Sequence, residues 1–239
     1  MEFLGRPVAP GLAGGPIVHA VAGSRGGKAP ARTGVLVASR WTDVAPAPEG
    51  ILPIAFILEE DEPPGSVRGG EPVVGGLSPD LFRDGELADV DGSSGRVRVA
   101  GLTEVQVVTA FLERDDGRVL LLRRSEKVGS FRGQWAAVSG FLEDPTPEQQ
   151  ALREVREETG IRPESLTVRA AAGPVYARDG GTVYTVHPFR MATRTAEVVL
   201  DWEHTESAWV DPAEIARRST VPNLDRAWRA VAPGRVRKG

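Results

Sequence analysis

The sequence predicts an α/β protein in two parts: a small β-dominated domain over residues 1–99, then an α/β domain over residues 100–239. The first part is rich in glycine and proline and breaks into short apolar runs, a pattern typical of short strands and turns. From Leu102 the apolar runs become long and alternate with polar residues. A stretch with helix-end residues, Thr146 to Gly160, follows these runs and completes the α/β pattern.

Composition excludes several classes of protein. With 239 residues and 41% hydrophobic content, the chain can bury a core. Its 29 basic and 33 acidic residues are interspersed, so no surface for duplex nucleic acid is expected. The longest apolar run, Ile51 to Leu58, is too short to span a bilayer, so no membrane association is expected. The chain has no cysteine, and MEFLGRPVAP has no secretory-signal pattern, so we expect a cytoplasmic location.

Five strands are expected in the first part: Pro16 to Val21, Gly34 to Ala38, Ile51 to Leu58, Glu86 to Val90 and Arg96 to Val99. The stretch GSRGGKAP, Gly23 to Pro30, has some likeness to a phosphate-binding loop. Ala22 and Ala29 stand where such a loop needs a glycine and a Ser or Thr, so a hairpin loop is expected instead.

The second part opens with a hairpin, Val105 to Arg124, whose tight turn is Asp115-Asp116-Gly117. In the helix that follows, Thr146 is the expected N-cap, Pro147 the first helical residue and Gly160 the C-terminal stop. Four strands are expected next: Leu166 to Ala171, Thr182 to Arg190, Glu197 to Trp202 and Ser207 to Val210. Two helices complete the pattern, one opened by Pro212 and one containing Leu224 and Trp228.

The segment REVREETGI, Arg153 to Ile161, carries three carboxylates, Glu154, Glu157 and Glu158. Their spacings of three and four put them on one face of a helix, where like charges repel. A Mg²⁺ ion would offset this repulsion, because it prefers oxygen ligands and binds through one or two carboxylates. The alternative is a solvated acidic face that Arg153 steadies by pairing with Glu157.

The capped helix, REVREETGI and the preceding Gly140 together resemble the Nudix box, the signature of the Nudix hydrolases. The segment REVREETGI matches the second half of the box at every specified position. In the first half one residue is missing, because the family's earlier glutamate would fall at Pro145 and its leading glycine at Ser139, whereas the sequence has Glu143 and Gly140.

The resemblance extends over Thr103 to Arg229 and implies an α/β/α sandwich with a mixed sheet. It also implies that Glu154, Glu157, Glu158 and the backbone carbonyl of Gly140 bind Mg²⁺, with Mn²⁺ as a possible substitute. We expect Glu158 to lie on a largely solvated face of the helix, so that its change to Gln would remove a charge without disturbing the fold.

Other site residues are expected outside the box. Nudix enzymes often take a further acid from the loop before the last strand, and Glu203 is the candidate for a general base, with a solvated loop acid as the alternative. His204 is expected to be an exposed loop histidine without function. The substrate-binding candidates are aromatic residues that could stack on a base and arginines that could hold phosphates: Phe131, Trp135, Tyr184, Arg123, Arg124 and Arg132. Phe189 is a further aromatic candidate, and at least half of these aromatics are expected in the core.

The first part also resembles the phosphohistidine swivelling domain of phosphoenolpyruvate-utilising enzymes, through the segments Gly5 to Val18 and Arg83 to Val99. In that family a phosphoryl-carrying histidine follows the strand that Ile51 to Leu58 would represent. Here EEDEPPGSV, Glu59 to Val67, stands in that place and has no histidine. His19 is expected to be structural, so the resemblance implies a scaffold without phosphoryl transfer, serving as a lid, a homodimer interface or a docking surface.

The sequence therefore predicts a Mg²⁺-dependent hydrolase that cleaves a phosphoanhydride bond of a nucleoside diphosphate linked to another moiety. The alternative is a catalytically weak or silent Nudix-type module that senses such a small nucleotide and signals through the first domain. A phosphohistidine carrier is disfavoured by the missing histidine.

Overall fold

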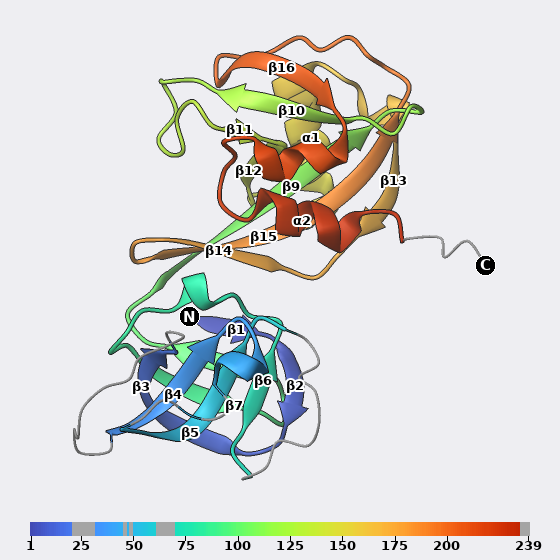
Figure 1. Cartoon of the computed structure of the whole chain (residues 1–239). Helices are drawn as coiled ribbons and strands as arrows, with labels where there is room; N and C mark the ends of the chain where they lie inside the picture. Colours follow the sequence, from blue (N-terminus) through green and yellow to red (C-terminus); the bar gives the residue numbers. More distant parts are fainter. Residues whose placement is uncertain (21–31, 45–46, 48–49, 61–69, 235–239) are drawn as a thin grey trace. The chain divides into compact units, whose positions relative to one another are not determined.

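The computed structural model describes residues 1–20, 32–44, 47, 50–60 and 70–234. The chain divides into two compact units (Figure 1): unit 1 is Met1–Thr103 with Arg178–Val183, and unit 2 is Glu104–Ala177 with Tyr184–Gly239. The loop expected at Gly23 to Pro30 lies outside the described residues, as does EEDEPPGSV beyond its first two residues. None of the helices in the described part of the chain combines the length and hydrophobicity of a membrane-spanning segment.

Unit 1 is built on one eight-stranded sheet in the order β1-β8-β7-β3-β4-β5-β6-β2. Its strands are β1 (Glu2–Leu4), β2 (Arg6–Ala9), β3 (Leu12–His19), β4 (Arg32–Ala38), β5 (Ile51–Leu58), β6 (Val73–Gly75), β7 (Leu87–Asp91) and β8 (Arg96–Val99). The strands from β3 to β6 are parallel, and the other pairs are antiparallel. Since β1 and β2 follow each other in the chain and stand at the two ends of this order, the sheet closes on itself.

Gly5 is the residue at which the closure occurs. Its N–H donates to the carbonyl of Gly95 at 2.8 Å, and a Cβ at this position would overlap the carbonyl oxygen of Gly75. Only glycine lets the two ends of the sheet come this close. Of the expected strands, Ile51 to Leu58 and Arg96 to Val99 are confirmed to the residue, and the other three are present with shifted bounds.

His19 ends β3 and is half-buried. Its Nδ1 lies 2.9 Å from Oδ1 of Asp84, and its Nε2 lies 3.1 Å from the carbonyl oxygen of Pro79. Its backbone N–H also donates to Asp84, and these bonds together hold the pKa of the Asp84 carboxyl below its usual value. Both ring nitrogens are thus engaged in joining β3 to the segment before β7.

Unit 2 contains a second sheet in the order β11-β10-β9-β15-β13, with β12 on β9, β14 on β15 and β16 on β10. Its strands are β9 (Thr103–Glu113), β10 (Val119–Arg124), β11 (Trp135–Ala136), β12 (Val138–Phe141), β13 (Leu166–Ala171), β14 (Val175–Asp179), β15 (Thr182–Thr193) and β16 (His204–Val210). Its helices are α1 (Pro147–Thr159) and α2 (Leu224–Val231).

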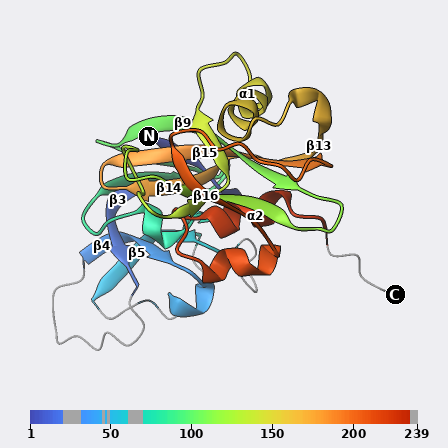
Figure 2. The ribbon, with the colours of Figure 1, turned by 90° about the horizontal axis from the view of Figure 1, so that it is seen from above.

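The two faces of this sheet carry separate cores. Because side chains alternate along a strand, Leu120 and Leu122 of β10 point to one face while Val119 and Leu121 point to the other. The first pair packs in the cluster that contains Val155 of α1, and the second pair packs with residues of α2. Figure 2 shows α1 and α2 on different sides of the strands. The predicted α/β/α sandwich is confirmed.

Helix α1 has the ends that the sequence predicts. The Oγ1 of Thr146 accepts from the backbone N–H of Gln149 at 3.3 Å, and Pro147 is the first helical residue. Gly160 ends the helix in a left-handed conformation, with φ of 71°, and its N–H donates to the carbonyl of Arg156. These local signals fix where the three carboxylates fall on the helix.

One expected strand of unit 2 is wrong, and one expected helix is present in the 3-10 form. Glu197 to Trp202 is not a strand: Val198 and Leu200 do pack on the core, but the N–H of Val199 donates to the carbonyl of Thr159 at the end of α1. The helix end therefore takes the hydrogen bond that a neighbouring strand would have taken. The helix opened by Pro212 is a 3-10 helix, Pro212–Arg217, because its N–H groups bond three residues back.

Candidate active site

The three box carboxylates have very different exposures. Glu158 is 3% exposed, Glu154 is half-buried and Glu157 is exposed. Burial raises the pKa of Glu158 well above its usual value, and the charges of Glu154 and Asp201 raise it further. Burial also raises the pKa of Glu154, and nearby Glu157 and Glu203 add to the effect. Two carboxyl groups are therefore held where their negative charges are poorly accommodated.

The expected solvated position of Glu158 is wrong. Its Oε2 atom is buried and has no hydrogen-bond partner within the described chain, although a backbone N–H of Ser139 bonds to the carboxylate. The helix turns this side chain inward because Val155 and Thr159, on either side of it, are packed in the core. A buried carboxylate oxygen without a donor fits a cation ligand, since burying such a group alone is costly.

His204 is also buried, contrary to expectation. It is the first residue of β16, and its Nε2 lies 3.8 Å from Oε2 of Glu158. Its Nδ1 lies 3.0 Å from Oδ1 of Asp201. The sequence gives no local signal for this burial, because it depends on the pairing of β16 with β10 over Glu158.

Gly140 lies in β12 beside α1. A Cβ at Gly140 would overlap the carboxylate of Glu154, so the absence of a side chain lets that carboxylate lie directly against the strand backbone. The carboxylates of Glu154 and Glu158 and the backbone carbonyl of Gly140 offer oxygen atoms, the kind of ligand that Mg²⁺ prefers, since this ion uses one or two carboxylates and keeps several waters. No three acidic or histidine side chains in the described ranges form a complete metal cluster by themselves.

A cavity of about 290 Å³ opens beside these groups. Seven of the predicted site residues line it: Arg124, Phe131, Gly140, Glu154, Glu157, Tyr184 and Glu203. The aromatic rings of Phe131 and Tyr184 meet edge to face with centroids 6.0 Å apart. Glu203 follows a turn in which its N–H donates to Oδ1 of Asp201 at 3.1 Å. The cavity thus brings carboxylates, an arginine and two aromatic rings together.

Three predicted substrate residues do not line this cavity. Arg123 lies next to Arg124 on β10, but alternation along the strand sends it to the other face, where its guanidinium lies 3.5 Å from the carboxylate of Glu206. Arg132 is exposed and its Nε donates to the carbonyl of Val128. Trp135 packs against the α2-side core beneath the guanidinium of Arg218. Phe189 is likewise a core residue.

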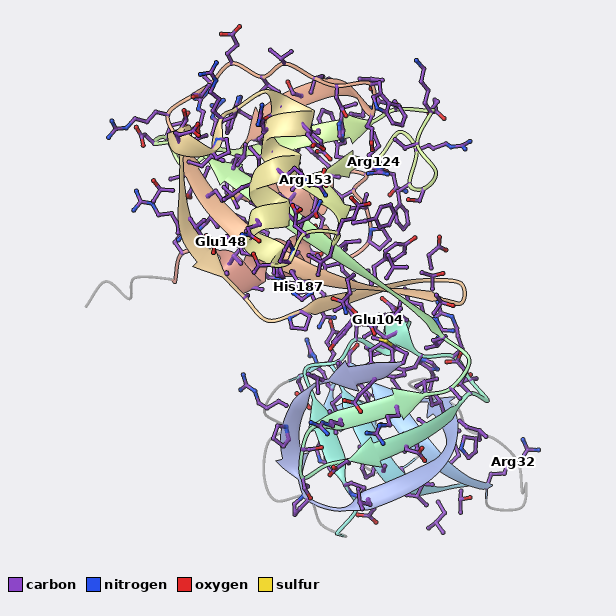
Figure 3. The ribbon with its side chains drawn as sticks, turned by 180° about the vertical axis from the view of Figure 1, so that it is seen from behind. Arg32, Glu104, Arg124, Glu148, Arg153 and His187 are labelled. Carbon is purple, nitrogen blue, oxygen red and sulfur yellow. The ribbon has the colours of Figure 1, made fainter. Side chains whose placement is uncertain are left out.

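The sequence missed some residues at this site. Arg153 lines the cavity and forms ion pairs with Glu143 and Asp144, at 3.0 and 3.1 Å, in place of the expected pair with Glu157. Figure 3 labels Arg153 on α1 and Arg124 on the sheet. The shortened loop between Gly140 and Thr146 was the sequence feature that could have predicted these ion pairs, because it brings Glu143 and Asp144 within reach of Arg153. Phe141 and Pro222 also line the cavity and had no sequence signal.

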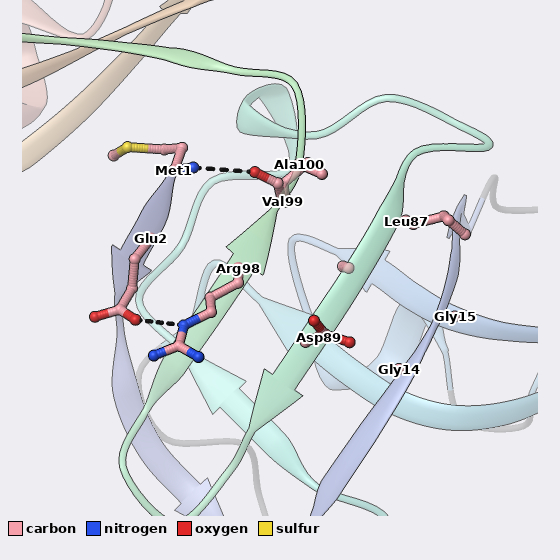
Figure 4. Close-up of a pocket in the computed structure, with 10 residues that line it drawn as sticks. Met1, Glu2, Gly14, Gly15, Leu87, Asp89, Arg98, Val99 and Ala100 are labelled. Atoms are coloured by element: carbon pink, nitrogen blue, oxygen red, sulfur yellow. Dashed lines mark hydrogen bonds and ion pairs between the residues drawn. The ribbon is translucent and has the colours of Figure 1, made fainter.

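Unit 1 has a more open hollow of about 720 Å³, lined by residues that include Gly14, Gly15, Asp89 and Arg98 (Figure 4). The guanidinium of Arg98 pairs with Glu2 at 2.6 Å, which holds the pKa of the Glu2 carboxyl below its usual value. None of the predicted site residues lines this hollow. The smaller cavity is therefore the candidate active site.

The model of the NUDIX domain matches residues 103–230, which is more than half of the chain. The chain belongs to the Nudix family. A MutT-like protein from Streptomyces ambofaciens is 33% identical over 112 residues, which cover 46% of this chain and 66% of that protein. The nucleoside triphosphatase NudI of Escherichia fergusonii is 29% identical over 118 residues, which cover 44% of this chain and 82% of that protein.

A solved structure of a MutT protein from Methanosarcina mazei Go1 is similar to the same region, with 28% identity and a TM-score of 0.48. The similarity covers 54% of this chain and 95% of that one. The Nudix resemblance of the second part is confirmed, and the matched residues lie almost wholly within unit 2. In this Nudix chain the box helix is α1, and the cavity beside it is formed by residues of unit 2 alone.

Proposed function

We propose that this chain is a Mg²⁺-dependent hydrolase that cleaves a phosphoanhydride bond of a nucleoside diphosphate linked to another moiety. The unpartnered Oε2 of buried Glu158 is the observation that carries the proposal. Its charged neighbour Glu154 lines the cavity that also holds aromatic and basic residues. Family membership and the similarity to a protein named a nucleoside triphosphatase support the hydrolase class.

The residues proposed to hold the cation are Glu154, Glu157, Glu158 and the carbonyl of Gly140. A bound Mg²⁺ or Mn²⁺ would neutralise charge on the phosphate oxygens and lower the pKa of a bound water. The protein's part is to place the carboxylates correctly, and a bound cation would favour their ionised form. Burial raises the pKa of both Glu154 and Glu158, and the charge of Glu154 raises the pKa of Glu158 further, so these charges are best accommodated when a cation is shared between them.

Glu203 is the proposed general base. It lines the cavity, and its charge contributes to the raised pKa of both Glu154 and Glu158, so it lies near them. The turn at Asp201, which accepts from the N–H of Glu203 and contacts His204, fixes where the Glu203 side chain starts. From this position its carboxylate would accept a proton from the attacking water.

Phe131 and Tyr184 are proposed to hold the nucleobase. Base stacking on an aromatic ring is worth about 1–3 kcal/mol. Arg124 supports this wall, because its Nε donates to the carbonyl of Ser130 at 3.0 Å, and its guanidinium also lines the cavity where a phosphate would lie. The aromatic wall and the carboxylates would thus bind the two ends of a nucleoside diphosphate.

A screen of nucleotide pyrophosphates with Mg²⁺ or Mn²⁺ tests the proposal, with nucleoside triphosphates, dinucleoside polyphosphates, ADP-sugars and NAD-like compounds as substrates. We expect release of a nucleoside monophosphate or of phosphate, and no release with Glu158→Gln. Binding of a nucleotide without turnover across the whole panel would refute hydrolysis and favour the alternative, a nucleotide-sensing module.

A further inference from the structure

Gln150 is a fully buried polar residue in the first turns of α1, at 0% exposure. It lies one helical turn before Glu154, on the side that faces the shortened loop after Gly140. A glutamine in such a position must satisfy both ends of its amide, because an unsatisfied buried polar group costs about 1–3 kcal/mol.

The contacts of Gln150 fix the orientation of its amide. Its Oε1 accepts from three donors, the backbone N–H groups of Glu143 and Asp144 and the Nη2 of Arg153, each at 2.9 Å. An NH₂ group could not accept from these donors, so the network assigns the oxygen to this side. The Nε2 therefore faces Glu154 and donates to its Oε1 at 2.5 Å.

The same amide thus joins the loop to a candidate metal ligand. The N–H groups of Glu143 and Asp144 would otherwise be left without a partner in a loop that is one residue shorter than the family pattern. Arg153 closes the arrangement through ion pairs with the side chains of these two acids. The carboxylate of Glu154 is held on one side by this amide and on the other by the bare backbone of Gly140.

We propose that Gln150 is a positioning residue that couples the shortened loop to Glu154 and fixes the orientation of that carboxylate for cation binding. The inference rests on the proposed function, because it assigns Glu154 as a ligand. A bond of this kind to a metal ligand is commonly worth 10- to 100-fold in metal affinity. The loop and the helix would then act together, and the carboxylate of Glu154 would keep its orientation although the loop is one residue short.

The variant Gln150→Glu separates the two roles of Gln150, which are to bind the loop N–H groups and to orient the carboxylate of Glu154. A glutamate keeps an oxygen for the loop N–H groups, and the guanidinium of Arg153 can balance its charge, but it puts a second oxygen where the donor to Glu154 stood. Gln150→Met keeps the volume and removes both roles. Gln149→Glu is the matched control, since residue 149 is exposed and takes part in the helix cap only through its backbone.

The experiment measures Mn²⁺ affinity by electron paramagnetic resonance and hydrogen exchange at the amides of Glu143 and Asp144, both on the full chain. For Gln150→Glu we expect the amides to stay protected and Mn²⁺ affinity to fall about 10- to 100-fold, with kcat lowered and KM for the nucleotide nearly unchanged. Gln150→Met should lose protection and affinity, and Gln149→Glu should keep both.

Wild-type Mn²⁺ affinity in Gln150→Glu with protected amides would overturn the inference and leave Gln150 as a loop support only. If Gln150→Glu does not fold, Gln150→Met decides: wild-type affinity despite fast amide exchange would overturn the coupling. A wild-type chain that binds Mn²⁺ without hydrolysing any nucleotide would refute the proposed reaction alone. A wild-type chain that does not bind Mn²⁺ would overturn both proposals.

Discussion

The Nε2 of His204 lies 3.8 Å from the Oε2 of Glu158, and both side chains are almost wholly buried. The carboxylate of Asp201 lies 3.0 Å from the opposite ring nitrogen, Nδ1. The separation of 3.8 Å between Nε2 and Oε2 is too long for a hydrogen bond, so the ring leaves the Oε2 of Glu158 without a partner within the described chain. This oxygen therefore remains available to the proposed cation.

Glu158→Gln should raise the thermal stability of the metal-free protein while removing turnover. The folded state raises the pKa of Glu158, so between the ordinary value of 4.5 and the higher folded value the native state binds the extra proton. Wild-type stability should accordingly fall as pH rises through this window, and the Gln variant should lack that part of the fall. Melting curves against pH measure the difference, expected to be on the order of 1 kcal/mol at pH 8.

The matched control for this variant is Glu157→Gln, because Glu157 is exposed on the same helix. It should change the melting temperature of the metal-free protein little. Equal turnover in Glu158→Gln and wild type would rule out Glu158 as a ligand. A lower melting temperature at pH 8 would show that the buried charge is already compensated within the protein.

Phe131→Gly should stabilise the fold and weaken nucleotide binding. Phe131 has φ of 51°, a left-handed conformation that costs a bulky residue about 1–3 kcal/mol and that glycine adopts freely. The variant should raise KM about 10-fold, which corresponds to the lower part of the stacking range, with kcat less affected. Tyr184→Phe is the control, since it keeps a ring beside Phe131. An unchanged KM in Phe131→Gly would show that the ring of Phe131 takes no part in nucleotide binding.

Acid should weaken unit 1 through Glu86. Hydrogen bonds from Arg178, at 2.8 and 2.6 Å, are the main cause of the lowered pKa of the Glu86 carboxyl. A carboxyl with a depressed folded pKa stabilises the protein above its unfolded value of about 4.5 and loses that effect as pH falls through the folded value. Glu86→Gln should therefore cost about 1–2 kcal/mol at pH 7 and almost nothing at pH 2.

Urea unfolding at the two pH values measures this difference. Glu71→Gln is a control, because Glu71 belongs to unit 1 and takes no part in the pair of Glu86 with Arg178. An equal loss of stability at both pH values would assign the effect to packing and not to charge.

The fragment 100–239 should fold and hydrolyse substrate without the first 99 residues, because the cavity is lined by unit 2 alone. Its hairpin tip, Arg178–Val183, would lose Glu86 and the carbonyl of Leu81 as partners of Arg178. We expect kcat within a few-fold of the full chain and faster amide exchange at this tip. A soluble fragment without activity would show that the first domain completes the site.

Unit 1 should accept no phosphoryl group. Both ring nitrogens of His19 already have close neighbours, the carboxylate of Asp84 and the carbonyl of Pro79, so a phosphoryl donor could reach neither nitrogen unless one of these contacts opened. Incubation of the full chain with labelled phosphoenolpyruvate or ATP should leave no acid-labile phosphate. Stoichiometric acid-labile label on His19 would contradict this and assign phosphotransfer to the chain.

Local signals predicted the box helix and its ends, because Thr146, Pro147 and Gly160 act on their immediate neighbours. The sandwich was implied by the resemblance to the Nudix family, and the alternation in β10, which is also local, agrees with it. The burial of Glu158 and His204 could not be predicted, because it depends on the pairing of β16 with β10, which brings His204 to within 3.8 Å of Glu158. The mistaken strand at Glu197 to Trp202 had the right alternation, yet its backbone partner is a helix end, a choice that only tertiary packing makes. Trp135 was expected to bind substrate, but the pairing of β11 with β10 places it against the core on the α2 side.

Unit 1 is made of two segments that lie far apart in the sequence, and this separation affects its folding during synthesis on the ribosome. Its first strands, β1 and β2, pair with β8 and β6, and its last six residues, Arg178–Val183, come from the hairpin between β14 and β15. Contacts between segments so far apart in sequence form slowly, because a long loop must close before they contribute. The first domain to emerge therefore cannot finish folding until residue 183 has left the exit tunnel, so the order of completion need not follow the order of translation.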